Sequence, residues 1–191
     1  YGQSTSRNAY LNGLDYDKLG RLHATWCWRE SGDPMTNHDL DYAWSSDAGR
    51  TWFNDAGQQI GERGKQAITI DSPGVRVAEI GMKRGLMNAT TQALDSRSRI
   101  HVVTFHLPEA APGEATWDAT RPKTHYFHYW REARGKWQRN EMEFNGSRPA
   151  LWFDAADNAY LVFVGDRFNP SPYLSIATAT ATSARRWSNS S

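Results

Sequence analysis

The chain has little of several features that define large protein classes. It contains one cysteine, Cys27, among 191 residues, so no internal disulfide can form. The apolar run around it, residues 24–28, predicts a buried thiol. A net charge of +1 lacks the excess of one sign that general binding to nucleic acid or to a membrane surface requires. No apolar run approaches the roughly 20 residues of a membrane-spanning helix, and no signal-peptide pattern stands at Tyr1.

Aromatic residues, in contrast, are plentiful. The sequence has nine Trp, eight Tyr and seven Phe, while its mean hydropathy is only −0.74. This combination is typical of many short strands that pack through aromatic side chains and are joined by polar loops. It does not suit a helical bundle. A chain of this length can bury one sizeable core, so we expect one all-β domain over residues 1–191.

One pattern recurs three times along the chain. Each copy begins with an aspartate, turns through small or polar residues and enters an alternating run typical of a β-strand. The copies start at Asp17, Asp95 and Asp154. A second β-type element follows each copy and ends at a tryptophan. Such self-similarity is the signature of a repeat architecture.

We interpret each copy as one four-stranded antiparallel blade of a β-propeller, in which blades stack around a central channel. The blades are expected over residues 1–53, 85–140 and 147–188. In the middle blade, the strands are expected over residues 88–94, 99–106, 125–131 and 136–139. Propellers typically have about four to eight blades. Three blades leave faces and edges uncovered, so we expect the chain to be part of a longer propeller whose remaining blades are its partners.

Residues 45–52 form a turn with a recognisable pattern. They read S-S-D-A-G-R-T-W and match S-x-D-x-G-x-T-W, the Asp box of sialidase-like β-propellers. The carboxylate of Asp47 can accept hydrogen bonds from the turn backbone. Gly49 supplies a conformation that a Cβ hinders, and Trp52 packs back over the hairpin. The pattern indicates an architecture, because such a turn lies away from any substrate.

Strand order in an up-and-down blade sorts the connections between two rims. The Asp-led turns and the Asp box lie on one rim, which we name the scaffold rim. The opposite rim, named the loop rim, receives the connections between second and third strands, expected at residues 30–37, 107–124 and 167–172. It also receives the starts of the first strands. Loops as long as residues 107–124 are more often functional than not in compact domains.

Charged and aromatic side chains gather on the loop rim. They end the second strands, begin the third strands or precede the first strands, and they are Arg29, His38, Asn88, His106, His125, Tyr126, Arg148, Arg167 and Tyr173. Tyr126 and Tyr129 alternate in their strand, so at most one of them faces a given cleft.

The remaining histidines are expected to be structural. His23 and His101 hold the same position in their two repeat copies. His128 faces away from His125 by strand alternation, so we expect it to pack between blades. For the same reason His125 and His128 cannot share a metal ion, and no zinc site is expected.

The chain resembles the BNR-repeat family that includes ulvan-lyase-type polysaccharide lyases. The likeness is carried by residues 36–43 leading into the Asp box, by residues 88–106 and by the segment H-Y-F-H-Y-W-R at 125–131. It implies a seven-bladed propeller, export from the cytoplasm, and β-elimination on a uronate-containing polysaccharide, with or without sulfate. It implies no cofactor and leaves a structural divalent cation open.

Such a lyase must neutralise the C5 carboxylate of the sugar, remove the C5 proton and protonate the departing glycosidic oxygen. The resemblance implies Arg148 as the carboxylate partner, through its planar guanidinium. It implies Tyr129 as base or acid, with Tyr126 in reserve, and His106 as an assisting base or carboxylate binder. The side chains expected to bind substrate are His38, Asn88, His125, Tyr126, Arg29, Arg167 and Tyr173.

Two other functions stay open at this point. A sialidase-like glycoside hydrolase is suggested by the Asp box, and the loop rim offers carboxylates such as Glu30 and Glu109 for it. A non-catalytic sugar-binding propeller would use Trp and Tyr to stack on pyranose rings. All three functions predict an acidic polysaccharide or another oligosaccharide as partner, and neither nucleic acid nor a membrane.

Overall fold

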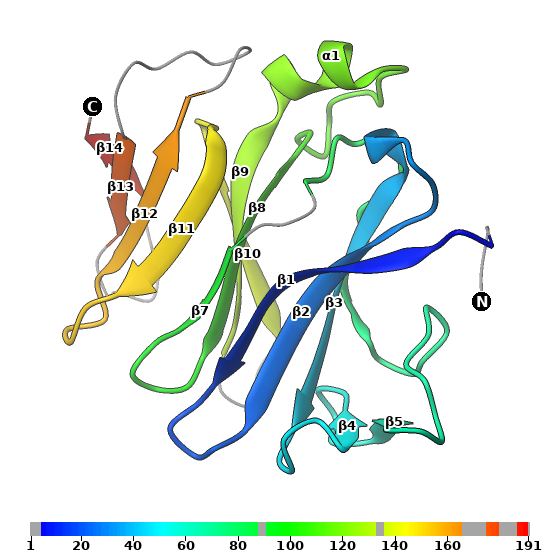
Figure 1. Ribbon diagram of the computed structural model, residues 1–191. Helices are drawn as coiled ribbons and strands as arrows, with labels where there is room; N and C mark the ends of the chain where they lie inside the picture. Colours follow the sequence, from blue (N-terminus) through cyan, green and yellow to red (C-terminus); the bar gives the residue numbers. More distant parts are fainter. Residues whose placement is uncertain (1–4, 88–90, 133–135, 166–174, 180–186, 191) are drawn as a thin grey trace.

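The computed structural model describes residues 5–87, 91–132, 136–165, 175–179 and 187–190 (Figure 1). This part of the chain is almost entirely β-structure and forms three antiparallel sheets that stand next to one another. The all-β propeller arrangement predicted from the sequence is therefore confirmed, with the sheets as its blades.

The first sheet is larger than the repeat pattern predicts. Its six strands are β1 (Asn8–Tyr16), β2 (Leu22–Arg29), β3 (Asn37–Ser45), β4 (Thr51–Phe53), β5 (Gln59–Glu62) and β6 (Arg76–Ala78). The outer edge of β3 is shared between two partners. It pairs with β4 through Trp44 and Phe53, and with β6 at Leu40 and Asp41. The segment after residue 53, which the repeat pattern does not cover, thus completes this sheet.

The second and third sheets have four strands each. The second contains β7 (Thr91–Leu94), β8 (Ile100–His106), β9 (His125–Arg131) and β10 (Trp137–Met142), and the third contains β11 (Ser147–Phe153), β12 (Ala159–Val164), β13 (Ser175–Ala179) and β14 (Ser188–Ser190). Short helices occur only in loops of the described chain: η1 (Pro34–Thr36) between β2 and β3, and α1 (Trp117–Thr120) with η2 (Arg121–Lys123) between β8 and β9.

The Asp-led turns share one hydrogen-bonding scheme. In each, the carboxylate accepts the backbone N–H groups two and four residues later, as Asp95 does from Arg97 and Arg99, each at 3.0 Å. Asp17 and Asp154 repeat this scheme. The fourth turn residue has a positive φ in every copy: 75° at Gly20, 61° at Ser98 and 62° at Asp157. The carboxylate therefore closes a turn that the backbone alone does not favour.

A fourth copy of this turn joins β4 to β5. Asn54 Oδ1 accepts the N–H groups of Ala56 and Gln58, each at 3.0 Å, and Gly57 has a φ of 77°. An asparagine replaces the leading aspartate, and for this reason the self-comparison of the sequence missed the copy.

The Asp box folds as its pattern predicts. Asp47 Oδ1 accepts the N–H groups of Arg50 and Thr51 at 3.0 and 2.9 Å. These bonds and those from the Thr51 and Ser45 hydroxyls lower the pKa of Asp47 to about 2. Gly49 has a φ of 82°, and a Cβ there would lie 3.3 Å from the Trp52 ring.

The two rims are separated as strand order requires. In Figure 1 the Asp-led turns and the Asp box lie at the lower end of the sheets, while η1, α1 and the start of β11 lie at the upper end. His106 ends β8 and Arg148 lies near the start of β11, so both belong to the loop rim. Gly49 belongs to the scaffold rim.

Side-chain alternation places one core on each side of the second sheet. Val102, Phe127 and Tyr129 pack toward the first sheet against Cys27 and Leu40. Residues of the other parity pack toward the third sheet, and this core contains Val103, Phe105, Tyr126, Leu161 and Phe163. Near the axis, Gln92 of β7 joins the first two sheets by bonds to Asp15 at 2.6 Å and Thr25 at 2.7 Å.

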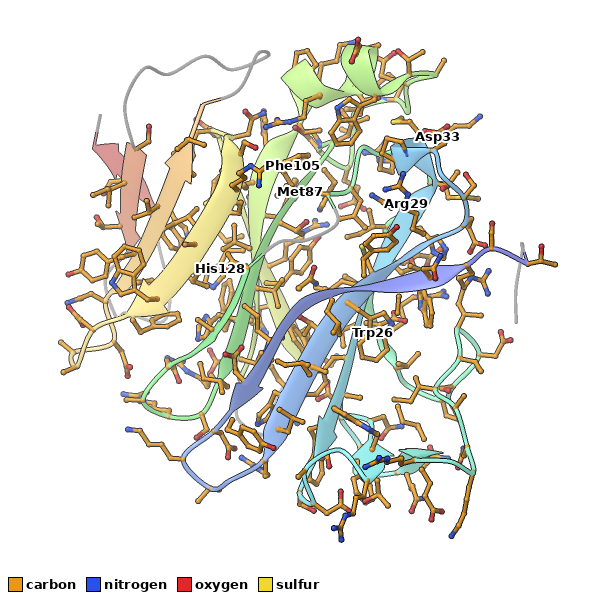
Figure 2. All side chains as sticks on the ribbon, viewed as in Figure 1. Trp26, Arg29, Asp33, Met87, Phe105 and His128 are labelled. Atoms are coloured by element: carbon orange, nitrogen blue, oxygen red, sulfur yellow. The ribbon has the colours of Figure 1, made fainter. Side chains whose placement is uncertain are left out.

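The three histidines expected to be structural, His23, His101 and His128, belong to this scaffold. His101 Nε2 lies 3.3 Å from Asp95 Oδ2, and His101 Nδ1 lies 2.8 Å from His128 Nε2. Trp187, which directly precedes β14 of the third sheet, donates to His128 Nδ1 at 3.3 Å. Figure 2 shows His128 on the side of the second sheet that faces the third. His23 repeats the contact to the turn carboxylate, with Asp17 at 3.2 Å.

Asp95 offers a test of the turn scheme. Its side chain is fully buried and accepts from two backbone N–H groups, from Arg99 and from His101. We predict that Asp95→Ala lowers the free energy of unfolding by about 3–5 kcal/mol, because buried charges lose their partner. Urea denaturation measures the loss. Asp154→Ala, in a more exposed copy of the turn, should cost less, and an equal cost would contradict the dependence on burial.

Candidate active site

His106 and Tyr129 meet on the loop rim, between the first and second sheets. His106 Nε2 lies 2.8 Å from the Tyr129 hydroxyl. The His106 ring stacks on Phe127 with a centroid distance of 3.8 Å. His106 is 4% and Tyr129 3% exposed. The structure thus brings together two of the three side chains to which the family resemblance gives catalytic roles.

The hydrogen bonds of His106 define its tautomer. His106 Nδ1 lies 2.8 Å from the Leu107 carbonyl oxygen. A carbonyl only accepts, so Nδ1 carries the proton and Nε2 is left as an acceptor. The Tyr129 hydroxyl therefore donates to Nε2. Burial lowers the pKa of His106 to about 4, and the charges of Arg139 and Arg84 act in the same direction. At neutral pH the imidazole is an uncharged base held against a phenolic proton.

The phenol itself is protonated at neutral pH. Burial raises the pKa of Tyr129 above its usual value, while the charge of Arg139 and a hydrogen bond from Arg139 act in the opposite direction. The two side chains thus share one proton that is held by Tyr129 and directed at His106.

Two arginines border this pair. Arg139 of β10 is the cross-strand partner of Tyr129, and its guanidinium lies 5.8 Å from the Phe127 ring centroid. It also forms an ion pair with Glu109 at 2.9 Å. Arg84 donates to the carbonyl oxygens of Leu107, at 3.3 Å, and of Pro108 and Ala111. Neither arginine is among the site residues expected from the sequence. The register of β10 against β9 is the signal that finds Arg139.

The other residues expected in β9 separate by face. His125 begins the strand as the cross-strand partner of His106, and it bonds Glu141 at 2.7 Å. It shares the face of Tyr129 by alternation. Tyr126 lies on the opposite face and is fully buried against Phe105, Phe144 and Phe163. The structure therefore places it in the core between the second and third sheets and not beside His106.

His38 belongs to a separate ionic network in the first sheet. Its Nε2 lies 2.7 Å from Glu30 and its Nδ1 3.0 Å from Asp39. Both partners are carboxylates that only accept, so both nitrogens carry protons and the ring is an imidazolium. Burial opposes the charge, but the hydrogen bonds to Asp39 and Glu30 raise the pKa of His38. Arg7 and Arg76 complete the network by pairing with Glu30 and Asp39.

The remaining expected residues lie elsewhere on the rim. Arg29 donates to the carbonyl oxygens of Ser31 and Gly32 beside η1 (Figure 2). Arg148 is exposed, has a φ of 50° and lies at a register shift in β11. It thus comes from the third sheet, whereas His106 and Tyr129 come from the second. Three further expected residues lie outside the described part of the chain: Asn88, Arg167 and Tyr173.

No group of three or more His, Cys, Asp or Glu side chains in the described part of the chain could hold a metal ion. None of its helices is long and apolar enough to cross a membrane.

Comparison with known proteins defines the family. The model of the BNR repeat-containing family matches residues 1–145, and the chain belongs to this family. No curated protein sequence matches the chain.

Two solved structures are similar in fold. The polysaccharide lyase Uly1 superposes with a TM-score of 0.55 and 16% identity, covering 95% of this chain and 36% of that one. An N-acetylgalactosamine deacetylase from F. plautii, in complex with blood group B trisaccharide, has a TM-score of 0.55 and 11% identity. It covers 98% of this chain and 53% of that one. The chain thus spans well under two thirds of either protein. Its neighbours are carbohydrate-active.

The His38 network predicts a dependence of stability on pH. In the folded protein the pKa of His38 lies above its usual value of 6.5. The folded protein therefore binds the proton more tightly than the unfolded chain, and the resulting stability is complete below pH 6.5. It is lost as the pH rises through the folded pKa. We predict that His38→Gln destabilises the protein at acidic pH and that its difference from the parent shrinks at alkaline pH, measured by urea denaturation.

Asp41 adds a second pH dependence of the same sign. Burial raises its pKa from 3.8 to about 7, although Trp28 donates a hydrogen bond to it. The contribution of Asp41 to the unfolding free energy should therefore fall as the pH rises from 3.8 to about 7, and Asp41→Asn should remove this contribution. A difference between His38→Gln and parent that stays constant across neutral and alkaline pH would contradict the imidazolium assignment.

Proposed function

We propose that the protein is a polysaccharide lyase that cleaves a uronate-containing polysaccharide by β-elimination. The observation that carries the proposal is the hydrogen bond of 2.8 Å between the Tyr129 hydroxyl and His106 Nε2, whose tautomer the Leu107 carbonyl defines. Membership of the BNR repeat-containing family and the fold likeness to a polysaccharide lyase support it.

In this proposal Tyr129 and His106 handle the protons. As the Tyr129 oxygen takes the C5 proton, its own proton moves to His106 Nε2. The C5 electron pair forms the C4–C5 double bond and expels the glycosidic oxygen from C4. That oxygen takes the proton now on Tyr129, and His106 returns the stored proton to Tyr129. A positioned acid–base pair of this kind contributes about 10²–10⁴-fold to the rate.

The charge around the pair suits an anionic substrate. Arg139 and Arg84 both lie close enough to lower the pKa of His106. Arg148, exposed on the same rim, is proposed as a partner for a substrate carboxylate, because a guanidinium binds a carboxylate through two parallel hydrogen bonds. Neutralising the carboxylate stabilises the negative charge that develops at C5.

Tyr129→Phe tests the acid–base pair. The variant keeps the packing but removes the hydroxyl, so we expect product formation to fall by about 10²–10⁴-fold. The measurement is the ultraviolet absorbance of the unsaturated product from ulvan and other uronate polysaccharides. Tyr126→Phe is the matched comparison from the same strand. It should leave turnover unchanged, because Tyr126 is buried on the other face.

The same assay separates the alternatives. New reducing ends without new absorbance would indicate a hydrolase, and sugar binding without either product would indicate a binding module. Full activity of Tyr129→Phe would remove Tyr129 from the mechanism.

Arg148→Ala tests the carboxylate partner. We expect KM for uronate polysaccharides to rise about tenfold or more, the effect of losing one charge-assisted hydrogen-bonded pair, while circular dichroism and thermal stability stay those of the parent. The matched substrate is the same polysaccharide with its carboxylates reduced to alcohols. An equal rise in KM for both substrates would contradict the role of Arg148 as the carboxylate partner.

A further inference from the structure

Arg139 lies between two different partners. On one side it lies next to Tyr129, its cross-strand partner in β9. On the other side its Nη2 lies 2.9 Å from Glu109 Oε2. The Arg139 side chain is 45% exposed and that of Glu109 82%. The guanidinium thus reaches from the buried Tyr129–His106 pair to solvent, and its solvent end is covered by a carboxylate.

That carboxylate comes from the loop and not from the sheet. Glu109 follows β8 by three residues, in the connection that leads to α1. Arg84 anchors this stretch by donating to the carbonyl oxygens of Leu107, Pro108 and Glu109. The backbone at Glu109 is therefore held in place, while its side chain extends over Arg139 through solvent.

We propose that Glu109 is an internal substitute for a substrate carboxylate. Arg139 is then a second carboxylate-binding position of the active site, besides the one proposed for Arg148. Glu109 occupies it in the free protein, and a uronate carboxylate of the polysaccharide displaces Glu109 when it binds. This inference rests on the proposed lyase function. It adds that Glu109 regulates the entry of substrate at the same site.

The position of Arg139 agrees with the chemistry. In a uronate the carboxylate is attached to C5, the carbon whose proton the Tyr129 oxygen is proposed to take. A carboxylate bound to Arg139 lies near that oxygen, because Arg139 and Tyr129 are cross-strand partners whose side chains share one face of the sheet. Binding at this position therefore brings C5 toward the base.

The exchange of carboxylates costs little. Ion pairs between exposed side chains alter an equilibrium constant by about fivefold or less. A substrate that makes further contacts with the rim displaces such a partner readily, whereas a small anion without those contacts competes poorly. Glu109 thus favours ligands that make further contacts with the rim over small anions, and it does not block the site.

Glu109→Gln tests the inference by binding. The probe is a set of ulvan oligosaccharides, and the same oligosaccharides with their carboxylates reduced to alcohols. We expect calorimetric titration to give about two- to fivefold tighter binding of the carboxylated set to Glu109→Gln than to the parent, with no change for the reduced set. Arg139→Gln should abolish this preference for carboxylates in the parent and in the Glu109→Gln background.

Glu114→Gln is the matched control. It makes the same change in the same loop, but Glu114 pairs with Lys123 and not with Arg139. It should leave the affinity for both sets unchanged. Tighter binding to Glu114→Gln as well would show that any lost negative charge has this effect, and the inference would be wrong.

The result also separates this inference from the lyase proposal. Unchanged affinity in Glu109→Gln, with product formation that still depends on Tyr129, would overturn the inference and leave the lyase intact. Carboxylate-specific tightening without any unsaturated product would support the inference and count against the lyase.

Discussion

The hydrogen bonds that close the Asp-led turns are the constraint on which the rest of the structure depends. Each carboxylate holds two backbone N–H groups and a residue with positive φ, and so reverses the chain from the first strand to the second. In two copies a histidine of the following strand contacts the same carboxylate. Because these turns all lie on the scaffold rim, every connection between second and third strands must lie on the loop rim, where the candidate site forms.

Side-chain alternation along β9 then places core residues on one face of the strand and the candidate catalytic tyrosine on the other. Tyr126 and His128 face the third sheet, where they are buried against aromatic rings. Phe127 and Tyr129 face the first sheet, where Tyr129 reaches His106. Two tyrosines three residues apart thus occupy environments that differ completely. Tyr129 is the one that shares a face with His106 and exchanges a proton with it in the proposed mechanism.

The sequence predicted what depends on turn chemistry and strand parity. The Asp box, the two rims, the strands of the second sheet and the opposite faces of Tyr126 and Tyr129 follow from local patterns. His38 is different. Asp39 has a φ of 59°, and the register shifts nearby, so that Trp28 pairs with His38 but Trp26 with Asp41. This bulge changes the face on which His38 lies, and strand parity alone does not predict it. Arg139 was missed because its place beside Tyr129 depends on the register of β10 against β9. The sequence of one strand does not specify that register.

The electrostatics of the rim connect the site to its proposed ligand. Arg139 and Arg84 disfavour a proton on His106, and the same positive charge of Arg139 lowers the pKa of Tyr129 against the effect of burial. The effect on Tyr129 favours release of the phenolic proton, whereas the effect on His106 opposes transfer of that proton to the imidazole. If a uronate replaces Glu109 on Arg139, one carboxylate leaves as another arrives. The net charge next to Tyr129 and His106 is then the same in the free and the bound protein. Substrate binding therefore leaves the electrostatic environment of the acid–base pair unchanged.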